Sequence, residues 1–391
     1  MIFIKVRINV KWEQHKLDAL AKFSKGKGYS KKDVTFQGYP LFLYGRLYTN
    51  YSEVVSDVDT YTSNLLEGSA VSNADEVVLP DSGETAEDIA RASWINKKGI
   101  ILGGGLLIIH PDKYLINSGF LSYSLSYGSN HKKLSSYAQG KSIVHIHSND
   151  LKKLYIFYPS RFNEQSKIFN ILNYLENLIT LQQRKLEILI KLKQSFLTKI
   201  MANNIDKNPE LYFNSASIKW LKQELSNLTI KEFKGNTKLN DTKTGKTEYL
   251  DAERLNGNVP LFIDKPINTL KSDILILWDG SKAGSVYYGF EGSLGSTLKA
   301  IRLNPKLVNS FFVYQQLKSK QDVIFNKYRT PNIPHVIKNF TKVYPIYFPS
   351  MAVQNKIARF LGNLDTLIEI QQKSIKDHKV IKKYLLQKLF I

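Results

Sequence analysis

The chain of 391 residues contains no cysteine, which excludes a disulfide scaffold and a cysteine-ligated zinc site. It also lacks an apolar run of the roughly 18 to 20 residues that span a bilayer. The first residues lack an apolar segment of signal-peptide length and a small-residue cleavage site, so nothing directs export. We therefore expect a cytoplasmic protein that is soluble and does not enter a membrane.

Acidic residues are few relative to basic ones. The 34 Asp and Glu residues stand against 55 Lys and Arg residues, which gives a formal charge of +21. This excess indicates a polyanionic ligand, with nucleic acid as the first candidate and an anionic membrane surface as the second. The chain is 43% hydrophobic and contains 22 Tyr, 20 Phe and 4 Trp, so it can bury real cores. Its length predicts two or three domains.

A long internal repeat organises the chain. Residues 165–184 recur as residues 354–373 at an offset of 189, and residues 157–160 recur as 347–350 at an offset of 190. Weaker equivalences are Trp12 with Trp220, Asp75 with Asp273 and Asn117-Ser118 with Asn309-Ser310. The sequence therefore consists of two tandem copies of one unit, in which a variable globular part precedes a long helix.

Each predicted helix has an apolar seam whose positions are spaced alternately by four and three residues, as in a coiled coil. The first seam comprises Ile168, Leu172, Leu175, Ile179, Gln182, Leu186, Leu189, Lys193, Phe196 and Ile200. The second comprises Ile357, Leu361, Leu364, Ile368, Gln371, Ile375, His378, Lys382, Leu385 and Leu389. The charged or polar Lys193, His378 and Lys382 either extend toward solvent or meet additional helices.

The matched lengths and seams predict that the two helices pair within the chain, with Gln182 and Gln371 fixing the register. Antiparallel pairing is favoured, because it relates the two globular units by a pseudo-twofold axis. Such a geometry suits two half-sites on duplex DNA. The alternative is two separate amphipathic helices, each lying on its own domain.

The globular units are predicted to be α+β, because short apolar strands alternate with short helices and polar turns. Residues 77–79, 106–109 and 274–277 are the clearest strands. Two basic, glycine-containing loops, residues 25–32 and 234–238, suit close approach to phosphates, although each alone is equally well explained as a solvated turn. The candidate DNA-contacting residues are Lys25, Lys27, Tyr29, Lys31, Arg46, Lys234, Asn236, Lys238, Arg254, Lys282, Lys327 and Arg329.

Catalytic motifs are missing from the sequence. Lys243–Thr247 resembles the end of a phosphate-binding loop, but Asn240 stands where that motif needs glycine. His145 and His147 share one face of a predicted strand, yet His147 has no histidine counterpart in the second copy, so a structural role is favoured over metal binding. We predict no catalytic residue and no metal site.

The two stretches that end each repeat resemble the specificity subunit of type I restriction-modification systems. The resemblance rests on Tyr158–Ser160, Leu178–Leu186 and Phe196–Met201 with their partners near 348–354, 367–368 and 385–390, and on Lys25–Lys32 and Ser82–Thr85. It covers nearly the whole chain. Val353, where the family usually has Glu, and one extra residue near Arg161 are small departures.

The resemblance implies two target recognition domains, residues 1–160 and 205–350, separated by spacer helices over residues 161–204 and 351–391. Each domain would read one half of a split double-stranded DNA sequence, with the helices as a ruler. Methylation subunits would dock on the helices and bring S-adenosylmethionine, and restriction subunits would bring ATP and Mg²⁺. This chain would then hold no cofactor.

Two other functions stay open at this stage. In one, the chain is a coiled-coil scaffold or a silent specificity cassette whose heads bind protein partners without reading DNA. In the other, it cuts or remodels DNA itself, which the missing carboxylate, phosphate-loop and methyl-donor motifs argue against.

Overall fold

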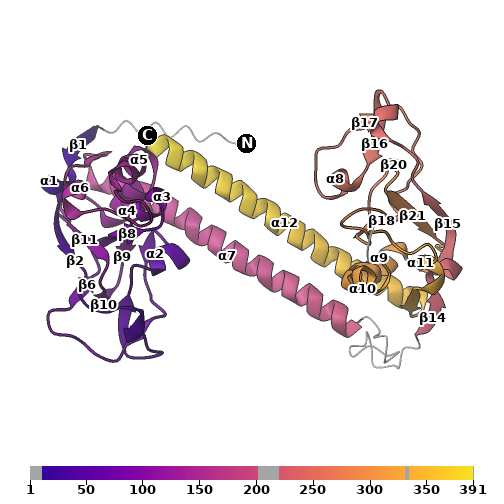
Figure 1. Cartoon of the computed structure of the whole chain (residues 1–391), viewed down its shortest axis with the longest axis horizontal. Helices are drawn as coiled ribbons and strands as arrows, with labels where there is room; N and C mark the ends of the chain where they lie inside the picture. Colours follow the sequence, from indigo (N-terminus) through magenta and orange to yellow (C-terminus); the bar gives the residue numbers. More distant parts are fainter. Residues whose placement is uncertain (1–10, 201–219, 331–333, 391) are drawn as a thin grey trace. The chain divides into compact units, whose positions relative to one another are not determined.

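A computed structural model of the chain describes residues 11–200, 220–330 and 334–390. The chain divides into two compact units (Figure 1). Unit 1 comprises the described residues up to Gln182 together with those from Ser374 onward, and unit 2 comprises those from Gln183 to Lys373. Each unit therefore contains one globular head and a part of both long helices. Head 1 denotes residues 11–161, and head 2 denotes residues 220–350.

Head 1 is built on a five-stranded sheet of order β2-β11-β7-β9-β4 and a four-stranded sheet of order β5-β3-β10-β6, with two small pairs, β1-β13 and β12-β8. Its strands are β1 (Trp12–Lys16), β2 (Ala21–Lys25), β3 (Tyr39–Phe42), β4 (Val54–Val55), β5 (Tyr61–Thr62), β6 (Ala70–Asn73), β7 (Val77–Pro80), β8 (Ser82–Gly83), β9 (Ser93–Ile95), β10 (Lys98–Leu102), β11 (Leu106–Pro111), β12 (Val144–His145) and β13 (Tyr155–Pro159). Its helices are α1 (Leu17–Leu20), η1 (Lys31–Asp33), α2 (Arg46–Thr49), α3 (Ala86–Ile89), α4 (Ser118–Ser126), α5 (Gly128–Tyr137) and α6 (Ser148–Lys152).

Head 2 has a four-stranded sheet of order β15-β21-β18-β19, a three-stranded sheet of order β17-β16-β20 and the pair β14-β22. Its strands are β14 (Leu221–Glu224), β15 (Thr229–Lys234), β16 (Thr244–Leu250), β17 (Phe262–Ile263), β18 (Ile274–Leu277), β19 (Val286–Tyr287), β20 (Ser293–Leu294), β21 (Leu298–Leu303) and β22 (Pro345–Phe348). Its helices are η2 (Leu225–Leu228), η3 (Leu239–Asp241), α8 (Ala252–Leu255), α9 (Ser310–Ser319), α10 (Gln321–Lys327) and α11 (Phe340–Val343).

The two heads share one strand topology, which confirms the internal repeat. The antiparallel ladder β2-β11-β7 of head 1 has its equivalent in β15-β21-β18, and β5-β3-β10 has its equivalent in β17-β16-β20. The β3-β10 and β16-β20 pairings are both parallel. The predicted equivalence of Asp75 with Asp273 is wrong by one residue. Glu76 directly precedes β7, as Asp273 directly precedes β18. Both carboxylates accept a backbone N–H from three residues upstream.

Two long helices of 39 residues each complete the fold, α7 (Phe162–Ile200) and α12 (Met351–Leu389). Each extends about 58 Å at ~1.5 Å per residue. In each unit, the core of the head continues onto both helices. Ile168 and Leu172 of α7 and Leu386 of α12 belong to the core of unit 1, and Leu361 of α12 and Ile200 of α7 belong to the core of unit 2. No helix within the described ranges combines the length and the apolar character that crossing a membrane requires.

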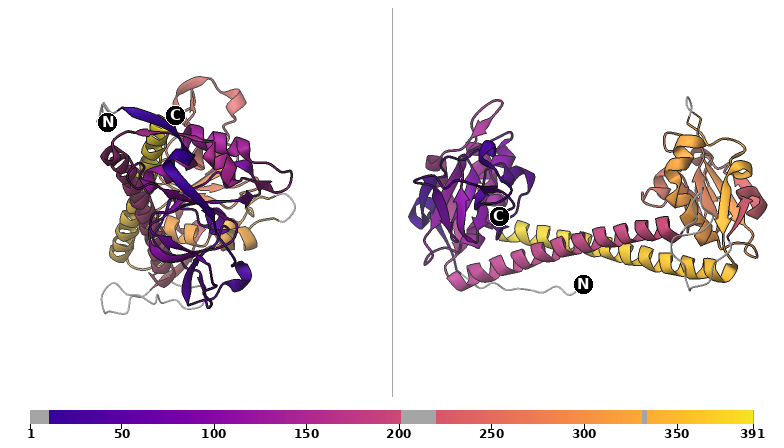
Figure 2. Two further views of the ribbon diagram at one scale, coloured as in Figure 1. Left: turned by 90° about the vertical axis from the view of Figure 1, so that its left-hand side faces the viewer. Right: turned by 90° about the horizontal axis from the view of Figure 1, so that it is seen from below.

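The helices pair in antiparallel orientation, as the seams predicted, and they run side by side in both units (Figure 2). In unit 1, the Gln182 amide donates to the Ser374 hydroxyl at 3.0 Å. In unit 2, the rings of Phe196 and Phe360 have their centroids 4.7 Å apart. Residues with higher numbers on α7 therefore contact residues with lower numbers on α12, as antiparallel pairing requires. Every seam position is buried or half-buried, which excludes two separate amphipathic helices.

A buried glutamine joins each head to the start of a long helix. In unit 1, the Gln165 carbonyl accepts the Asn117 N–H at 2.8 Å, and its amide donates to the Pro159 carbonyl at 3.0 Å. In unit 2, Gln354 makes the same two bonds, to Asn309 N–H at 2.8 Å and to the Pro349 carbonyl at 2.9 Å. Each asparagine also caps a helix, α4 or α9. Each glutamine side chain is itself buried and satisfies backbone groups at the junction of head and helix.

Replacement of Gln354 by alanine should therefore destabilise the protein. The change leaves a buried N–H and a buried carbonyl without partners, at about 1–3 kcal/mol each, so we expect a decrease of ~2–4 kcal/mol in the free energy of unfolding. Urea unfolding followed by circular dichroism measures it. Gln372→Ala, at an exposed position of the same helix, is the control, and an equal shift in both variants would contradict the assigned role.

Candidate nucleic-acid interface

The first basic loop follows β2 and crosses over the turn between β10 and β11. A Cβ on Gly26 would lie 1.9 Å from the Gly103 carbonyl oxygen, so only glycine fits at this crossing. The Gly104 N–H donates to the Gly28 carbonyl at 2.8 Å, and Gly28 has a φ of +58°. These glycines approach the backbone of the neighbouring turn. These glycines therefore let two chain segments cross, and the approach of the loop to phosphate stays a prediction.

The second basic loop makes the same crossing in head 2. A Cβ on Gly235 would lie 2.1 Å from the Gly295 carbonyl oxygen. The Gly235 N–H donates to the Leu298 carbonyl at 2.9 Å, as the Gly26 N–H donates to the Leu106 carbonyl. The two loops are thus equivalent parts of a repeated frame, and each crossing glycine follows an exposed lysine, Lys25 or Lys234.

Tyr29 does not present its ring to a ligand in this structure. The side chain is 6% exposed, and its hydroxyl bonds to the Ser69 hydroxyl and accepts the Leu66 N–H, each at 2.7 Å. The ring packs with Leu41 and Ile101 in a small core of its own. Tyr29 therefore anchors the loop, while Lys25, Lys27 and Lys31 around it are exposed.

The three candidate arginines are engaged within their own heads. Arg46, at the start of α2, pairs with Asp59, and Arg254 of α8 pairs with Glu248. Arg329 donates to the Ser281 carbonyl at 3.0 Å. Because these guanidiniums already have partners, they are held in fixed positions, and a base contact would have to use their remaining donors.

Several candidates of head 2 converge on one turn. A hollow of about 440 Å³ is lined by Lys282, Ser281 and Asp279 together with the amides of Asn256 and Asn258. Lys234 reaches the same turn through a 2.6 Å ion pair with Asp279. Of the candidate lysines, Lys282 alone lines the hollow, beside the carboxylates of Asp279 and Glu253, and asparagine side chains suit base edges. Asn236, Lys238 and Lys327 are exposed elsewhere on head 2 and do not line this hollow.

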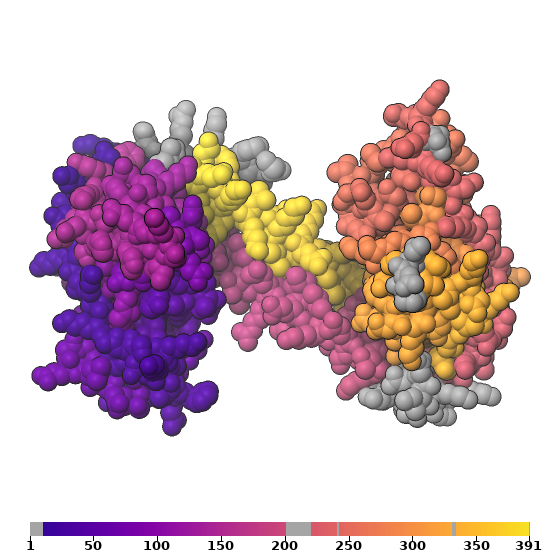
Figure 3. Space-filling model, viewed as in Figure 1, coloured from indigo at the N-terminus to yellow at the C-terminus, as the bar shows by residue number. Residues whose placement is uncertain are grey.

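Exposed aromatic residues near the first loop were not among the predicted contacts. Phe36 is fully exposed, and Tyr39 and Tyr44 are 48% and 42% exposed. The indigo-coloured segment that contains these residues lies in unit 1 (Figure 3). Aromatic faces that stand in solvent beside lysines suit stacking on bases. The signal in the sequence was four aromatic residues from position 36 to position 44, of which Phe42 is buried and the other three are exposed.

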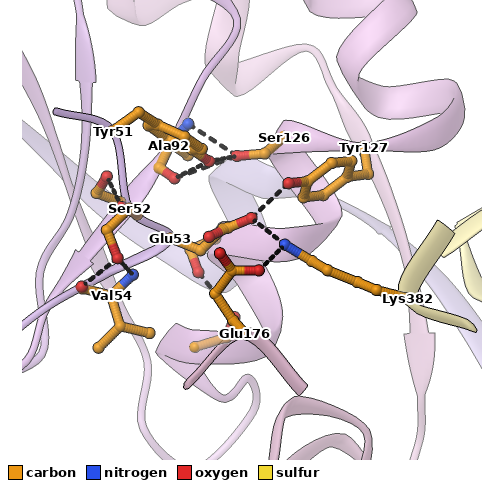
Figure 4. Close-up of polar contacts among 12 residues, drawn as sticks. Tyr51, Ser52, Glu53, Val54, Ala92, Ser126, Tyr127, Glu176 and Lys382 are labelled. Carbon is orange, nitrogen blue, oxygen red and sulfur yellow. Dashed lines mark hydrogen bonds and ion pairs between the residues drawn. The ribbon is translucent and has the colours of Figure 1, made fainter. Parts of the chain in front are cut away.

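The most deeply buried ionic cluster lies between head 1 and both helices (Figure 4). The Lys382 ammonium of α12 lies 3.0 Å from Glu53 Oε1 and 2.6 Å from Glu176 Oε2 of α7. The Tyr127 hydroxyl also donates to Glu53 Oε1. Desolvation acts to lower the pKa of Lys382, but the two carboxylates outweigh it and raise that pKa. Lys382 therefore stays charged and connects α12 with α7 and with head 1.

Unit 2 contains the repeat-equivalent pair. Lys193 Nζ lies 2.5 Å from Asp365 Oδ1, and Asp365 Oδ2 accepts the Gln315 amide at 2.7 Å. Both lysines were expected to extend toward solvent or to meet additional helices. Each lysine instead pairs with a carboxylate of the opposite helix. Antiparallel packing places Lys193 beside Asp365 and Lys382 beside Glu176.

Lys382→Met should destabilise unit 1 strongly, because it leaves the Glu53 and Glu176 carboxylates buried together without a cation. Breaking a buried pair in this way costs about 3–5 kcal/mol. The raised pKa of Lys382 sets the pH dependence. The stabilisation is fully present below the unfolded pKa of about 10.4 and is lost as pH rises through the folded value. Urea unfolding at pH 7 and above pH 10 measures both effects.

The matched control is Lys383→Met, which removes the same charge from an exposed neighbour. Combining Lys382→Met with Glu53→Gln should recover part of the stability, since one of the two buried charges is then gone. A Lys382→Met protein as stable as the Lys383→Met protein would show that the cluster contributes no stability.

Comparison with known proteins agrees with this architecture. Residues 9–194 and 223–377 match the family model of the type I restriction modification DNA specificity domain. The chain is 25% identical over 404 residues to a Mycoplasma genitalium protein named as a putative type I specificity subunit, and the alignment covers 99% of this chain and 96% of that protein. It is 33% identical over 150 residues to the MjaVIII specificity subunit of Methanocaldococcus jannaschii, spanning 37% of this chain and 35% of that relative.

Solved structures show the same fold. The crystal structure of a type I restriction-modification S subunit from M. genitalium superposes with a TM-score of 0.71 at 20% identity, covering 99% of this chain and 98% of that one. The repeated heads and paired helices define a two-copy specificity fold. The chain belongs to the family of type I restriction-modification specificity subunits.

Proposed function

We propose that this chain reads a bipartite double-stranded DNA target, one half with each head, and positions methylation subunits on that target. The observation that carries the proposal is the repetition of one head frame, down to the glycine crossing and the lysine that precedes it, on two helices that pair with each other. In the proposal, lysines of both loops contact phosphates, and Lys282, the amides of the head 2 hollow and the exposed aromatics beside the first loop contact bases.

The outer faces of the long helices support docking of a protein partner. Ile171, Tyr174, Leu181 and Ile188 form an exposed apolar stripe on α7, at spacings of three and seven residues. Leu367, Ile370, Ile381 and Tyr384 are similarly exposed on α12. Helix faces with this spacing suit further helices of a bundle. A structure from a study of type I complex assembly and conformational transition has the same fold, with a TM-score of 0.52 at 14% identity.

The proposal assigns the chemistry to partner subunits. S-adenosylmethionine would be bound by the methylation subunits, and ATP and Mg²⁺ by restriction subunits. This chain would contribute no catalytic residue and no cofactor. The methylating partner would reach its target adenine by flipping it out of the stack. The scaffold alternative, in which the heads do not read DNA, predicts that the loop lysines are dispensable.

Methylation mapping tests the proposal directly. In a host that expresses this chain with its methylation subunit, single-molecule sequencing should reveal a new split motif with methylated adenine. Exchanging head 2 for that of another specificity subunit should change one half of the motif and leave the other half unchanged. The host without this chain is the control. A complex that assembles but adds no methylation would favour the scaffold function.

The loop lysines should set salt-dependent affinity. Replacing Lys25, Lys27 and Lys31 by alanine should weaken binding to all duplexes alike and reduce the slope of log K against log[salt] by about 0.9 for each phosphate that is no longer neutralised. Fluorescence anisotropy of the methylating complex on duplexes with and without the motif measures both quantities. Replacing the exposed Lys185, Lys191 and Lys199 of α7 removes the same charge. Equal effects of the two triple substitutions would indicate that net charge alone matters.

A further inference from the structure

Unit 2 contains a hollow of about 480 Å³ formed by the second half of α7, the end of α9 and α12. Its charged lining consists of Lys193, Lys318 and Lys320 together with a single acid, Asp365. Ile190, Leu197 and Ile368 contribute apolar walls. Three basic residues and one acidic residue give the lining an excess of positive charge.

Asp365 is fully occupied by its neighbours. Its Oδ1 receives the Lys193 ammonium at 2.5 Å, and its Oδ2 receives the Gln315 amide at 2.7 Å. Lys318 donates instead to the neutral amide oxygen of Gln321 at 2.9 Å. Among the described residues of unit 2, no carboxylate forms an ion pair with Lys318. Asp365 therefore compensates Lys193 and leaves the charge of Lys318 unmatched.

The electrostatics of Lys318 agree with this geometry. Desolvation is the main cause that lowers the pKa of Lys318, and the nearby charge of Lys193 lowers it further. The residue is nevertheless exposed at the rim of the hollow. A carboxylate that enters the hollow would therefore meet the Lys318 ammonium, which is accessible and already partly desolvated.

The internal repeat shows how the equivalent place in unit 1 is completed. Lys382 and Glu176 correspond to Lys193 and Asp365 at the offset of 189. In unit 1, head 1 supplies a second carboxylate, Glu53, at 3.0 Å from the lysine. Ser126 stands at the position equivalent to Lys318, at the offset of 192 that relates α4 to α9. Unit 1 thus supplies an additional acid of its own, whereas unit 2 has an additional base.

We propose that the hollow of unit 2 receives an Asp or Glu side chain of the docked methylation subunit, which pairs with Lys318. The inference rests on the proposed function. A protein segment suits the hollow better than a DNA phosphate, because it can present apolar side chains to the walls of Ile190, Leu197 and Ile368 together with an acid for the lysines. The two docking positions on the chain are therefore chemically different.

The test uses the full-length chain and its methylation subunit. Lys318→Glu should weaken one of the two binding steps at least tenfold in calorimetric titration and leave the other unchanged, whereas Lys318→Arg should bind normally. Lys306→Glu makes the same charge change at an exposed residue elsewhere on head 2 and should bind like the unmodified chain. Thermal melting of each free variant verifies folding, and Lys318→Ala, expected to lose less affinity, is the second variant if Lys318→Glu fails to fold.

Zero-length carbodiimide cross-linking provides an independent readout. In the unmodified complex, Lys318 should couple to an Asp or Glu of the methylation subunit, and reversing the charge of that acid should restore binding to the Lys318→Glu chain. Equal affinity of the Lys318→Glu and Lys306→Glu chains, or a Lys318→Glu chain that assembles normally but binds DNA more weakly, would overturn the inference. A methylation subunit that does not bind even the unmodified chain would instead overturn the proposed function.

Discussion

The structure depends on the antiparallel pairing of α7 and α12. Neither head closes its core alone: Leu172 and Leu386 complete the core of unit 1, and Leu361 and Ile200 complete that of unit 2. A change in the register of the helices would therefore displace core residues of both units at once. Apolar seam positions provide most of the burial, but apolar packing alone tolerates sliding. The polar residues of the seam restrict the register.

Those polar residues work in repeat-equivalent pairs. Lys382 meets Glu176 in unit 1, and Lys193 meets Asp365 in unit 2, so a register that satisfies one pair satisfies the other. A shifted register would leave charged groups buried without partners, which is strongly destabilising. Each pair also reaches into its own head, through Glu53 in one unit and Gln315 in the other. Register and head attachment are thus controlled by the same few atoms.

The sequence predicted the features that depend on periodicity or repetition. The seam follows from spacings of three and four residues. The repeat of residues 165–184 as 354–373 makes Gln165 and Gln354 equivalent positions. Features that depend on tertiary contact were missed. The partner of Lys382 lies 329 residues away at Glu53, and the glycines of the basic loops meet a turn far along the chain. The local sequence around Tyr29 does not determine whether its ring is buried, because that burial depends on packing against Leu41 and Ile101.

The glutamine bonds and the ion pairs have a consequence for how such a chain can change over generations. Each head joins the helices through a glutamine that both repeats possess, Gln165 or Gln354, whereas the contact with the helix ion pair differs, with Glu53 in head 1 and Gln315 in head 2. Recombination within the matched segments 165–184 and 354–373 would therefore exchange an entire head while keeping the helix pairing intact. A new head could be acquired in one genetic event if it supplied the group that contacts Lys382 or Asp365, as Glu53 and Gln315 do here.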